Sequence, residues 1–189
     1  MLFTMFDVTV AEVEAKLSVY ISNVLKSKVI HPCTIFLPTI ETLFIETVKE
    51  NCRLLIISIY RPPSSNAIRF IDKLSELMSI ISGNGYDEII LCGDVKLDIL
   101  NYDNNENTLN LLNSLTSQSP VPIITKPSQI TNQTATLIDN IFTNQANRFV
   151  FGILISDISD HLPLFILKRN MFTKNILSTK HKCEISSNQ

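Results

Sequence analysis

The stretch RLLIISIYRPPSS, residues 53–65, contains the apolar run that decides the fold. From Arg53 to Tyr60 the side chains are almost continuously aliphatic, which is typical of a strand buried on both faces of a sheet. Pro62 and Pro63 follow, and two prolines cannot continue a hydrogen-bonded ladder. The sequence therefore predicts a buried strand that ends at Tyr60.

A helix and a second buried strand are expected next. Apolar residues recur at helical spacing over residues 66–82, with Ser65 as the N-cap and Gly83-Asn84-Gly85 as the stop signal. The short run from Glu88 to Cys92 predicts a buried strand, and Asp94 follows at its carboxyl end. Strand ends of α/β proteins carry many catalytic groups, so this position favours a function for Asp94.

The other periodic segments predict more strands than helices. A helix is expected at about Glu106 to Ser117, after the polar loop Asn101 to Asn105, because leucines share one of its faces. Since strands outnumber helices, we expect mixed sheets with helices outside them rather than a purely parallel sheet. The further predicted strands are residues 17–22, 43–48, 121–125, 136–143, 149–156 and 162–168.

Composition bounds the class of protein. The chain has 189 residues, of which 45% are hydrophobic, so it allows one domain with ample apolar surface for a core. The net charge is -2, and no basic stripe argues for nucleic acid, so such a partner must be argued from a site. No apolar run approaches the roughly 20 residues of a membrane-spanning helix. Residues 1–10 lack the basic start of a signal peptide, so we expect an intracellular protein, nuclear or cytoplasmic.

The cysteines lie far apart in the chain and form no Cys-x-x-Cys pair. Buried free thiols are therefore favoured over disulfides or a metal site, which fits a reducing compartment. The four cysteines are Cys33, Cys52, Cys92 and Cys183.

Three short clusters, residues 93–96, 138–142 and 159–163, each place a carboxylate where a buried strand would surface. Phosphodiester hydrolysis needs a cation near the phosphate, a base for water and relief of charge on the leaving oxygen, which carboxylates, magnesium and histidine can supply. Neighbouring side chains of an extended chain point apart, so Asp139 rather than Asp160 is expected to partner His161. Each cluster alone is explained equally well as a turn, a cap or a hydrogen-bonded histidine, but their order favours a site.

Four segments of the chain carry a resemblance to a known family. They resemble the endonuclease domain of non-LTR (LINE-type) retrotransposons, which belongs to the endonuclease/exonuclease/phosphatase superfamily. The resemblance covers about Leu17 to Lys168. The four segments are YRPPSS (60–65), GDVKLDIL (93–100), ATLIDNIFTN (135–144) and SDISDHLPLF (156–165).

The resemblance implies a four-layered α/β sandwich with mixed β-sheets flanked by helices. It also implies a magnesium-dependent nick in DNA that primes reverse transcription, with a reverse transcriptase domain in the ancestral polyprotein. The positions that match the family's motifs imply these roles: Tyr60 contacts the phosphate, Asp94 orients or deprotonates the attacking water, Asp139 orients His161, His161 stabilises charge on the scissile phosphate, and Asp160 helps to hold the metal.

Two departures from the family pattern affect the expected site. Family members carry Gly-Asp-Phe-Asn where this chain has Gly93-Asp94-Val95-Lys96, so Lys96 replaces an asparagine. An ammonium group donates but cannot accept a hydrogen bond, so Lys96 can touch phosphate but should weaken metal binding. The family also opens with a strand that bears an asparagine and then a metal-binding glutamate. Glu12 and Glu14 lie too close to Leu17 to supply that glutamate, so we expect a domain without the opening strand or strands.

These expectations divide the chain into three parts. Residues 1–16 form an atypical N-terminal segment, in which residues 2–10 are a candidate substitute strand for an otherwise unpaired sheet edge. Residues 17–169 form an incomplete endonuclease/exonuclease/phosphatase-like domain, and residues 170–189 form a polar tail.

Three hypotheses about function follow. The first is a retrotransposon-derived, metal-dependent DNA endonuclease domain that is catalytically impaired, because both Lys96 and the missing glutamate affect the site. The second is an active phosphodiesterase or phosphatase of the same superfamily on another substrate, with Lys96 as a phosphate ligand. The third is a non-catalytic nucleic-acid-binding or interaction remnant that keeps the scaffold.

Overall fold

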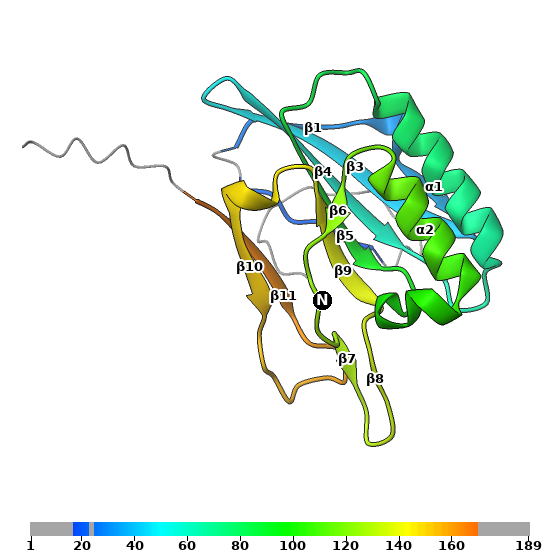
Figure 1. Ribbon diagram of the computed structural model, residues 1–189. Helices are drawn as coiled ribbons and strands as arrows, with labels where there is room; N and C mark the ends of the chain where they lie inside the picture. Colours follow the sequence, from blue (N-terminus) through cyan, green and yellow to red (C-terminus); the bar gives the residue numbers. More distant parts are fainter. Residues whose placement is uncertain (1–16, 23–24, 170–189) are drawn as a thin grey trace, which may run out of the picture.

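A mixed sheet of seven strands forms the centre of the computed structural model, which describes residues 17–22 and 25–169 (Figure 1). The strand order is β1-β3-β4-β5-β9-β6, and β2 pairs with the other part of β3. All neighbours in this sheet are antiparallel except β4 and β5, which are parallel. The strands are β1 (Ser27–Val29), β2 (Ile35–Leu37), β3 (Ile40–Lys49), β4 (Cys52–Tyr60), β5 (Glu88–Asp94), β6 (Val121–Pro122) and β9 (Asp139–Thr143).

The predicted strand, helix and strand unit is confirmed. Helix α1 (Ala67–Ile81) joins the parallel strands β4 and β5, and β5 continues as far as Asp94. The predicted N-cap is wrong by one residue, because the Asn66 side chain, and not Ser65, accepts a hydrogen bond from the backbone N–H of Arg69. Ser65 is instead buried where the chain leaves the two prolines.

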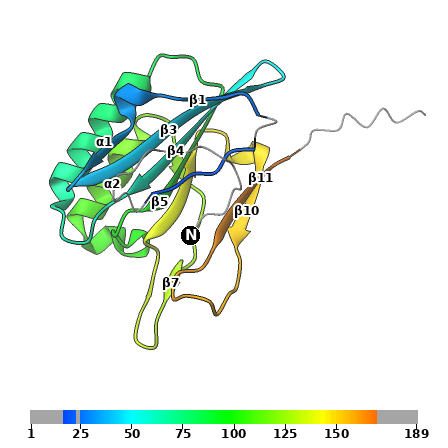
Figure 2. The same cartoon turned by 180° about the vertical axis from the view of Figure 1, so that it is seen from behind.

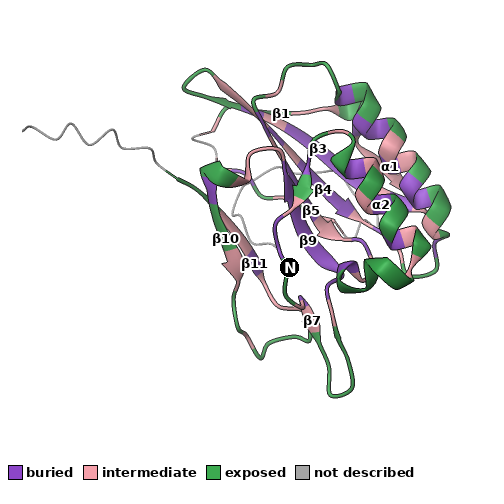
Figure 3. Cartoon of the chain, viewed as in Figure 1, coloured by how far each residue is buried: buried purple, intermediate pink, exposed green. Residues whose placement is uncertain are grey.

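Helices α1 and α2 (Glu106–Thr116) lie side by side and cover one face of the main sheet (Figures 1 and 2). Their inward faces and the middle of the sheet are buried (Figure 3). The predicted second helix is therefore confirmed, with Asn105 as its N-cap. The polar segment before this helix was expected to be a loop, but it contains a 3-10 helix, Ile99–Asn104. The Asp98 carboxylate caps the 3-10 helix by accepting a hydrogen bond from the backbone N–H of Leu100.

Two small antiparallel sheets complete the described structure: β10 (Phe149–Ile153) with β11 (Leu164–Lys168), and β7 (Gln129–Ile130) with β8 (Ala135–Thr136). The β10–β11 pair lies on the side of the main sheet away from the helices (Figures 1 and 2). Two further 3-10 helices, His31–Cys33 and Ala146–Arg148, connect the strands. These sheets and the outer helices confirm the predicted mixed α/β fold.

A buried carboxylate joins the β10–β11 sheet to the main sheet. The Glu88 side chain is fully buried, and its two oxygens accept from Arg148 Nη1 at 2.9 Å and Lys168 Nζ at 2.8 Å. Burial alone would raise the pKa of Glu88, but the hydrogen bonds from Lys168 and Arg148 outweigh burial and lower the pKa. The ion pairs therefore hold Glu88 in its charged form.

Several predicted strands have different limits in the structure. Residues 17–22 alternate in polarity but form no strand. Their apolar side chains instead pack with Leu43 and Ile45 on one face of the main sheet. The alternation of polar and apolar residues therefore indicated which side chains are buried, but not that the backbone pairs with a neighbouring strand. The strand predicted at 43–48 is part of the longer β3, and the one predicted at 121–125 is shorter, as β6. The segment predicted as one strand, 136–143, contains parts of two, β8 and β9. The strand predicted at 149–156 ends earlier, with β10 at Ile153, and the one predicted at 162–168 begins later, with β11 at Leu164.

Some predictions concern residues outside the described ranges. The substitute strand 2–10, the residues Glu12 and Glu14, the tail 170–189 and Cys183 all lie there. The absence of the opening strand and the domain limits stay predictions.

Cys33 and Cys92 are buried free thiols, whereas Cys52 is partly exposed. Burial raises the pKa of Cys92 to about 11. Among the described helices, none is both long and apolar enough to cross a membrane.

Candidate active site

Three neighbouring strands present polar side chains at one edge of the main sheet. Tyr60, at the end of β4, is the Cα partner of Asp94 at the end of β5. Asp94 is in turn the Cα partner of Asp139 at the start of β9. The parallel pairing of β4 with β5 and the antiparallel pairing of β5 with β9 both end at these residues. Side chains that are far apart in the sequence therefore form one row. The structure thus places three of the predicted site residues side by side.

Asp139 and His161 form a hydrogen-bonded pair beside this row. Asp139 Oδ2 lies 2.8 Å from His161 Nδ1, and it also accepts from Ser128 Oγ at 3.0 Å. The backbone N–H of Asp139 donates to the same Ser128 Oγ at 2.9 Å, and Ser128 is fully buried. Since a carboxylate only accepts, His161 Nδ1 donates to Asp139, and Nε2 is the acceptor in the neutral form of the ring. The predicted partner of His161 is therefore present, while the catalytic roles of both residues stay predictions.

Gln129 contacts the outer side of His161. Its Nε2 lies 3.1 Å from His161 Nε2 and donates to Asp160 Oδ2 at 2.7 Å. The backbone supports this contact, because Gln129 and His161 form an isolated antiparallel bridge. The hydrogen bond from Gln129 lowers the pKa of Asp160, and the nearby His161 adds to this effect. Gln129 thus covers Nε2, the ring nitrogen of His161 that does not contact Asp139.

Lys96 binds the Asp94 carboxylate twice. Lys96 Nζ lies 2.6 Å from Asp94 Oδ2, and the backbone N–H of Lys96 donates to Asp94 Oδ1 at 3.1 Å. Both carboxylate oxygens are therefore used within one tight turn. Burial raises the pKa of Asp94, the Lys96 ammonium partly offsets this, and the charge of Asp139 adds to the rise. The turn places two carboxylates and one ammonium group close together.

Gly93 and Arg61 give this turn its shape. Gly93 has a φ of +149°, and a Cβ atom there would lie 1.8 Å from the carbonyl oxygen of Ile59, so only glycine fits. Arg61 donates from its guanidinium to the carbonyl oxygens of Lys96 at 2.9 Å and Ser65 at 3.0 Å. Burial lowers the pKa of Arg61, and Asp94 opposes this shift. Arg61 therefore ties the turn to the end of β4.

Asp94, Asp139 and His161 could form a metal-binding group, because one ligand atom from each lies within 4.8 Å of the others. All three residues already make hydrogen bonds or ion pairs within the protein, however. The ammonium of Lys96 binds Asp94, and Ser128 and His161 bind Asp139. A magnesium ion prefers several free oxygen ligands in near-octahedral geometry, so it does not fit this arrangement unless Lys96 leaves. Asp160, the predicted metal ligand, is not in this group and is bound by Gln129.

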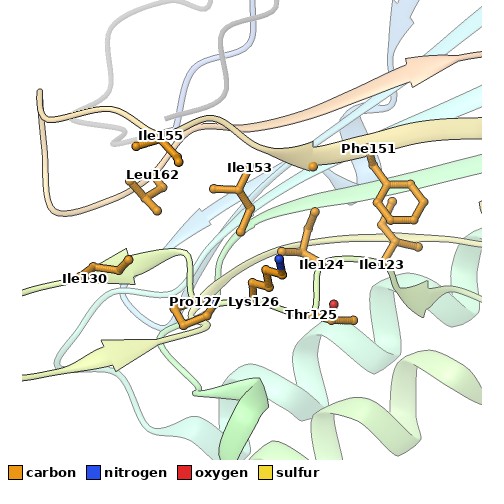
Figure 4. A pocket seen from close by; sticks show the side chains of 11 residues that line it. Ile123, Ile124, Thr125, Lys126, Pro127, Ile130, Phe151, Ile153, Ile155 and Leu162 are labelled. Atoms are coloured by element: carbon orange, nitrogen blue, oxygen red, sulfur yellow. The ribbon is translucent and has the colours of Figure 1, made fainter.

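An apolar pocket of about 480 Å³ lies between residues 123–130 and strand β10 (Figure 4). Its lining includes Ile130 and Leu162, the neighbours of Gln129 and His161 in sequence, and Lys126 is its one charged lining residue. None of the predicted site residues lines it. The pocket is therefore an apolar surface that is separate from the row of polar side chains at the strand ends.

Sequence reasoning missed three residues of the site: Arg61, Ser128 and Gln129. Arg61 carried a readable signal, since an arginine between a buried strand and two prolines has to satisfy its guanidinium nearby. Ser128 and Gln129 carried none, because Gln129 begins a two-residue strand, Ser128 directly precedes it, and the contacts of both form only in the folded chain.

Comparisons with known proteins agree on the fold. A family model described as "Endonuclease-reverse transcriptase" matches residues 54–165. The endonuclease domain of TRAS1, a telomere-specific non-LTR retrotransposon, superimposes with a TM-score of 0.63 at 12% identity, covering 80% of this chain and 72% of that one. An endonuclease/exonuclease/phosphatase family protein from Leptotrichia buccalis C-1013-b gives a TM-score of 0.50 at 12% identity, covering 68% of this chain and 54% of that one. No curated protein sequence matches the chain.

Proposed function

The chain belongs to the endonuclease-reverse transcriptase family, and we propose that it is a retrotransposon-derived DNA endonuclease domain whose hydrolytic activity is impaired. The substrate is a DNA phosphodiester, and the site is the row of strand ends with His161 beside it. One observation carries the proposal: the buried Asp139 carboxylate holds His161 at 2.8 Å next to Asp94. A histidine fixed by a carboxylate can act on a phosphate oxygen at neutral pH.

The roles of the residues follow from their hydrogen bonds. Asp139 fixes the proton of His161 on Nδ1, so Nε2 faces outward and can exchange a proton with water or a phosphate oxygen once Gln129 moves aside. When the imidazole is protonated, Asp139 stabilises its charge, and the cation can offset charge that develops on the phosphate. The Lys96 ammonium supplies a second donor for phosphate from the other side of the site.

The hydrogen bonds and the ion pair of Asp94 are the reason to expect impaired hydrolysis. A general base needs a free oxygen within hydrogen-bond reach of the attacking water. Both oxygens of Asp94 accept from Lys96, and the ammonium at 2.6 Å makes the carboxylate a weaker base toward a water molecule. The same ion pair opposes the magnesium ion that the family resemblance implies. We therefore expect slow cleavage rather than the rate of an intact site.

A plasmid-nicking assay in magnesium buffer tests the proposal. The wild-type chain is expected to convert supercoiled plasmid to the open circle slowly, and His161→Ala is expected to abolish this conversion. The matched control is His31→Ala, since His31 is an exposed histidine in another part of the fold. Nicking that His161→Ala leaves unchanged would contradict the proposed site, and fast nicking that depends on His161 would contradict the impairment.

A non-catalytic DNA-binding module is the second candidate, and the Lys96–Asp94 pair favours it. With both Asp94 oxygens bonded to Lys96, the site keeps phosphate donors, while the carboxylate that would activate water is held in an ion pair. This candidate predicts salt-dependent binding of a DNA oligonucleotide, without cleavage, that weakens when Lys96 is replaced. The third reading, an active enzyme on another phosphate ester, predicts hydrolysis of small phosphorylated compounds that Lys96→Ala abolishes.

A further inference from the structure

Two carboxylates, those of Asp94 and Asp139, lie close together in the site. The two residues are Cα partners on neighbouring strands, and their ligand atoms belong to the group that lies within 4.8 Å. Two carboxylates at this separation repel each other and attract a cation. Ser128 and His161 partly compensate Asp139, but they do not reach Asp94 in the described structure. A positive charge on the Asp94 side therefore offsets this repulsion.

Lys96 supplies this charge from a fixed position. Its ammonium contacts Asp94 Oδ2 at 2.6 Å and its backbone N–H binds Oδ1, so side chain and backbone grip the same carboxylate. Its φ of +51° is in the left-handed region, which lysine rarely adopts. The guanidinium of Arg61 holds the Lys96 carbonyl in this conformation. The ammonium is thus built into the turn.

We propose that the Lys96 ammonium is a tethered cation that takes the place of a divalent ion between Asp94 and the substrate phosphate. An ammonium has three N–H donors, and Asp94 Oδ2 uses one of them. The Lys96 side chain is 26% exposed, so a phosphate oxygen can reach the remaining donors. A divalent ion has to displace an intramolecular partner to enter. The site therefore binds phosphate without divalent metal and binds the metal weakly.

The class of ligand, a DNA phosphodiester, rests on the function proposed above, whereas the exclusion of divalent ions does not. Two measurements on the full chain separate these parts. The first uses Mn²⁺ alone, with the free ion quantified by electron paramagnetic resonance. The second uses a fluorescent DNA oligonucleotide, with binding followed by anisotropy in the presence or absence of EDTA.

In the Mn²⁺ titration, Lys96→Asn is expected to bind the ion at least about tenfold more tightly than the wild-type chain, because a cation site strengthens when its net negative charge grows. Asparagine tolerates the left-handed conformation, so this variant is expected to fold. Lys96→Met removes the charge without adding an oxygen ligand and should show a gain in the same direction. The control is Lys73→Asn, which removes a lysine that pairs with Glu76 on helix α1.

In the DNA titration, EDTA is expected to leave the affinity of the wild-type chain unchanged and to weaken binding by Lys96→Asn severalfold. Equal Mn²⁺ affinities of the wild-type, Lys96→Asn and Lys96→Met chains would overturn the tethered cation. So would wild-type DNA binding that EDTA abolishes. If no chain binds DNA while the Mn²⁺ gain appears, the proposed substrate fails and the tethered cation is upheld.

Discussion

The histidine side and the lysine side of the site are built in different ways. On the histidine side, Ser128, Asp139 and His161 come from separate segments, and the carboxylate is buried among them. On the lysine side, Asp94 and Lys96 belong to one tight turn and satisfy each other locally. A change of one residue in the turn can therefore alter the charge of the site without moving the fold. A change on the histidine side affects three segments at once.

The largest expected effect concerns the glycine that allows the turn. Gly93→Ala is expected to destabilise the fold by more than about 3 kcal/mol, because the added methyl group meets the backbone oxygen of Ile59 and the left-handed φ is strained. Urea denaturation followed by circular dichroism measures this. Gly83→Ala is the matched control, since Gly83 also has a positive φ but open space around it. It should cost only about 1 kcal/mol, as backbone strain alone does. Equal losses of stability in Gly93→Ala and Gly83→Ala would show that the folded protein relieves the clash at Gly93.

The histidine side is tested by removing its carboxylate. Asp139→Ala leaves Ser128 Oγ and His161 Nδ1 without their acceptor and is expected to cost about 1–3 kcal/mol. Nitrogen NMR of the histidine ring should also show that the proton no longer stays on Nδ1 of His161. Asp157→Ala, at an exposed carboxylate of the loop before His161, should change neither observable. An unchanged tautomer in Asp139→Ala would contradict the pairing.

The lysine side is tested through pH. The pKa of Asp94 is raised mainly by burial, and Lys96 limits the rise, so Lys96→Met is expected to raise it further. An acid whose folded pKa is raised loses stability when it ionises. The cost is full above the folded pKa and vanishes below the unfolded value of about 3.9. Lys96→Met should therefore be more destabilising than Lys73→Met at pH 7, and the difference should shrink as the pH falls toward 4. A constant difference would contradict the ion pair.

Glu88 provides a comparison of opposite sign. Its pKa is lowered because the hydrogen bonds from Lys168 and Arg148 outweigh burial. Its stabilising contribution is therefore present above the unfolded pKa of about 4.3 and is lost as the pH falls below that value through the folded pKa. Glu88→Gln should make the acid side of the stability curve flatter, as measured by urea denaturation between pH 7 and pH 3. A variant curve as steep as the wild-type curve would show that other carboxylates carry the acid dependence.

The smallest expected effect concerns the cover of the histidine. Gln129→Ala removes the main cause of the lowered pKa of Asp160, so this pKa is expected to rise toward its ordinary value. A carbon NMR titration of the Asp160 carboxyl group measures the change. Thr131→Ala is the control, since the Thr131 hydroxyl lies on the same hairpin and bonds to Thr134. A pKa of Asp160 that stays lowered in Gln129→Ala would assign the shift to His161 instead.

The parts of the molecule that sequence predicted well are those set by periodicity. The apolar run before Tyr60 and the helical spacing after Asn66 determined the strand, helix and strand unit, and with it the position of Asp94. The Asp139–His161 pair could be predicted because adjacent Asp160 and His161 cannot face the same way. These signals lie within single segments of the chain.

Other parts depend on contacts that no local pattern carries. Residues 17–22 have the alternation of a strand, yet they form no strand, and their apolar side chains pack on the main sheet. Gln129 reaches His161 through a two-residue strand, which is too short for a periodic signal. The grip of Lys96 on both oxygens of Asp94 depends on a left-handed backbone that sequence did not reveal.

One measurement compares the two sides directly: line broadening of the His161 imidazole resonances by Mn²⁺ in histidine-labelled protein, with His31 as the internal reference. The tethered cation predicts that His161 and His31 respond alike in the wild-type chain. In Lys96→Asn, His161 should broaden selectively at low Mn²⁺, because the ion then enters the group that Asp94 and Asp139 form with His161. Selective broadening of His161 in the wild-type chain at the same Mn²⁺ concentration would contradict the account.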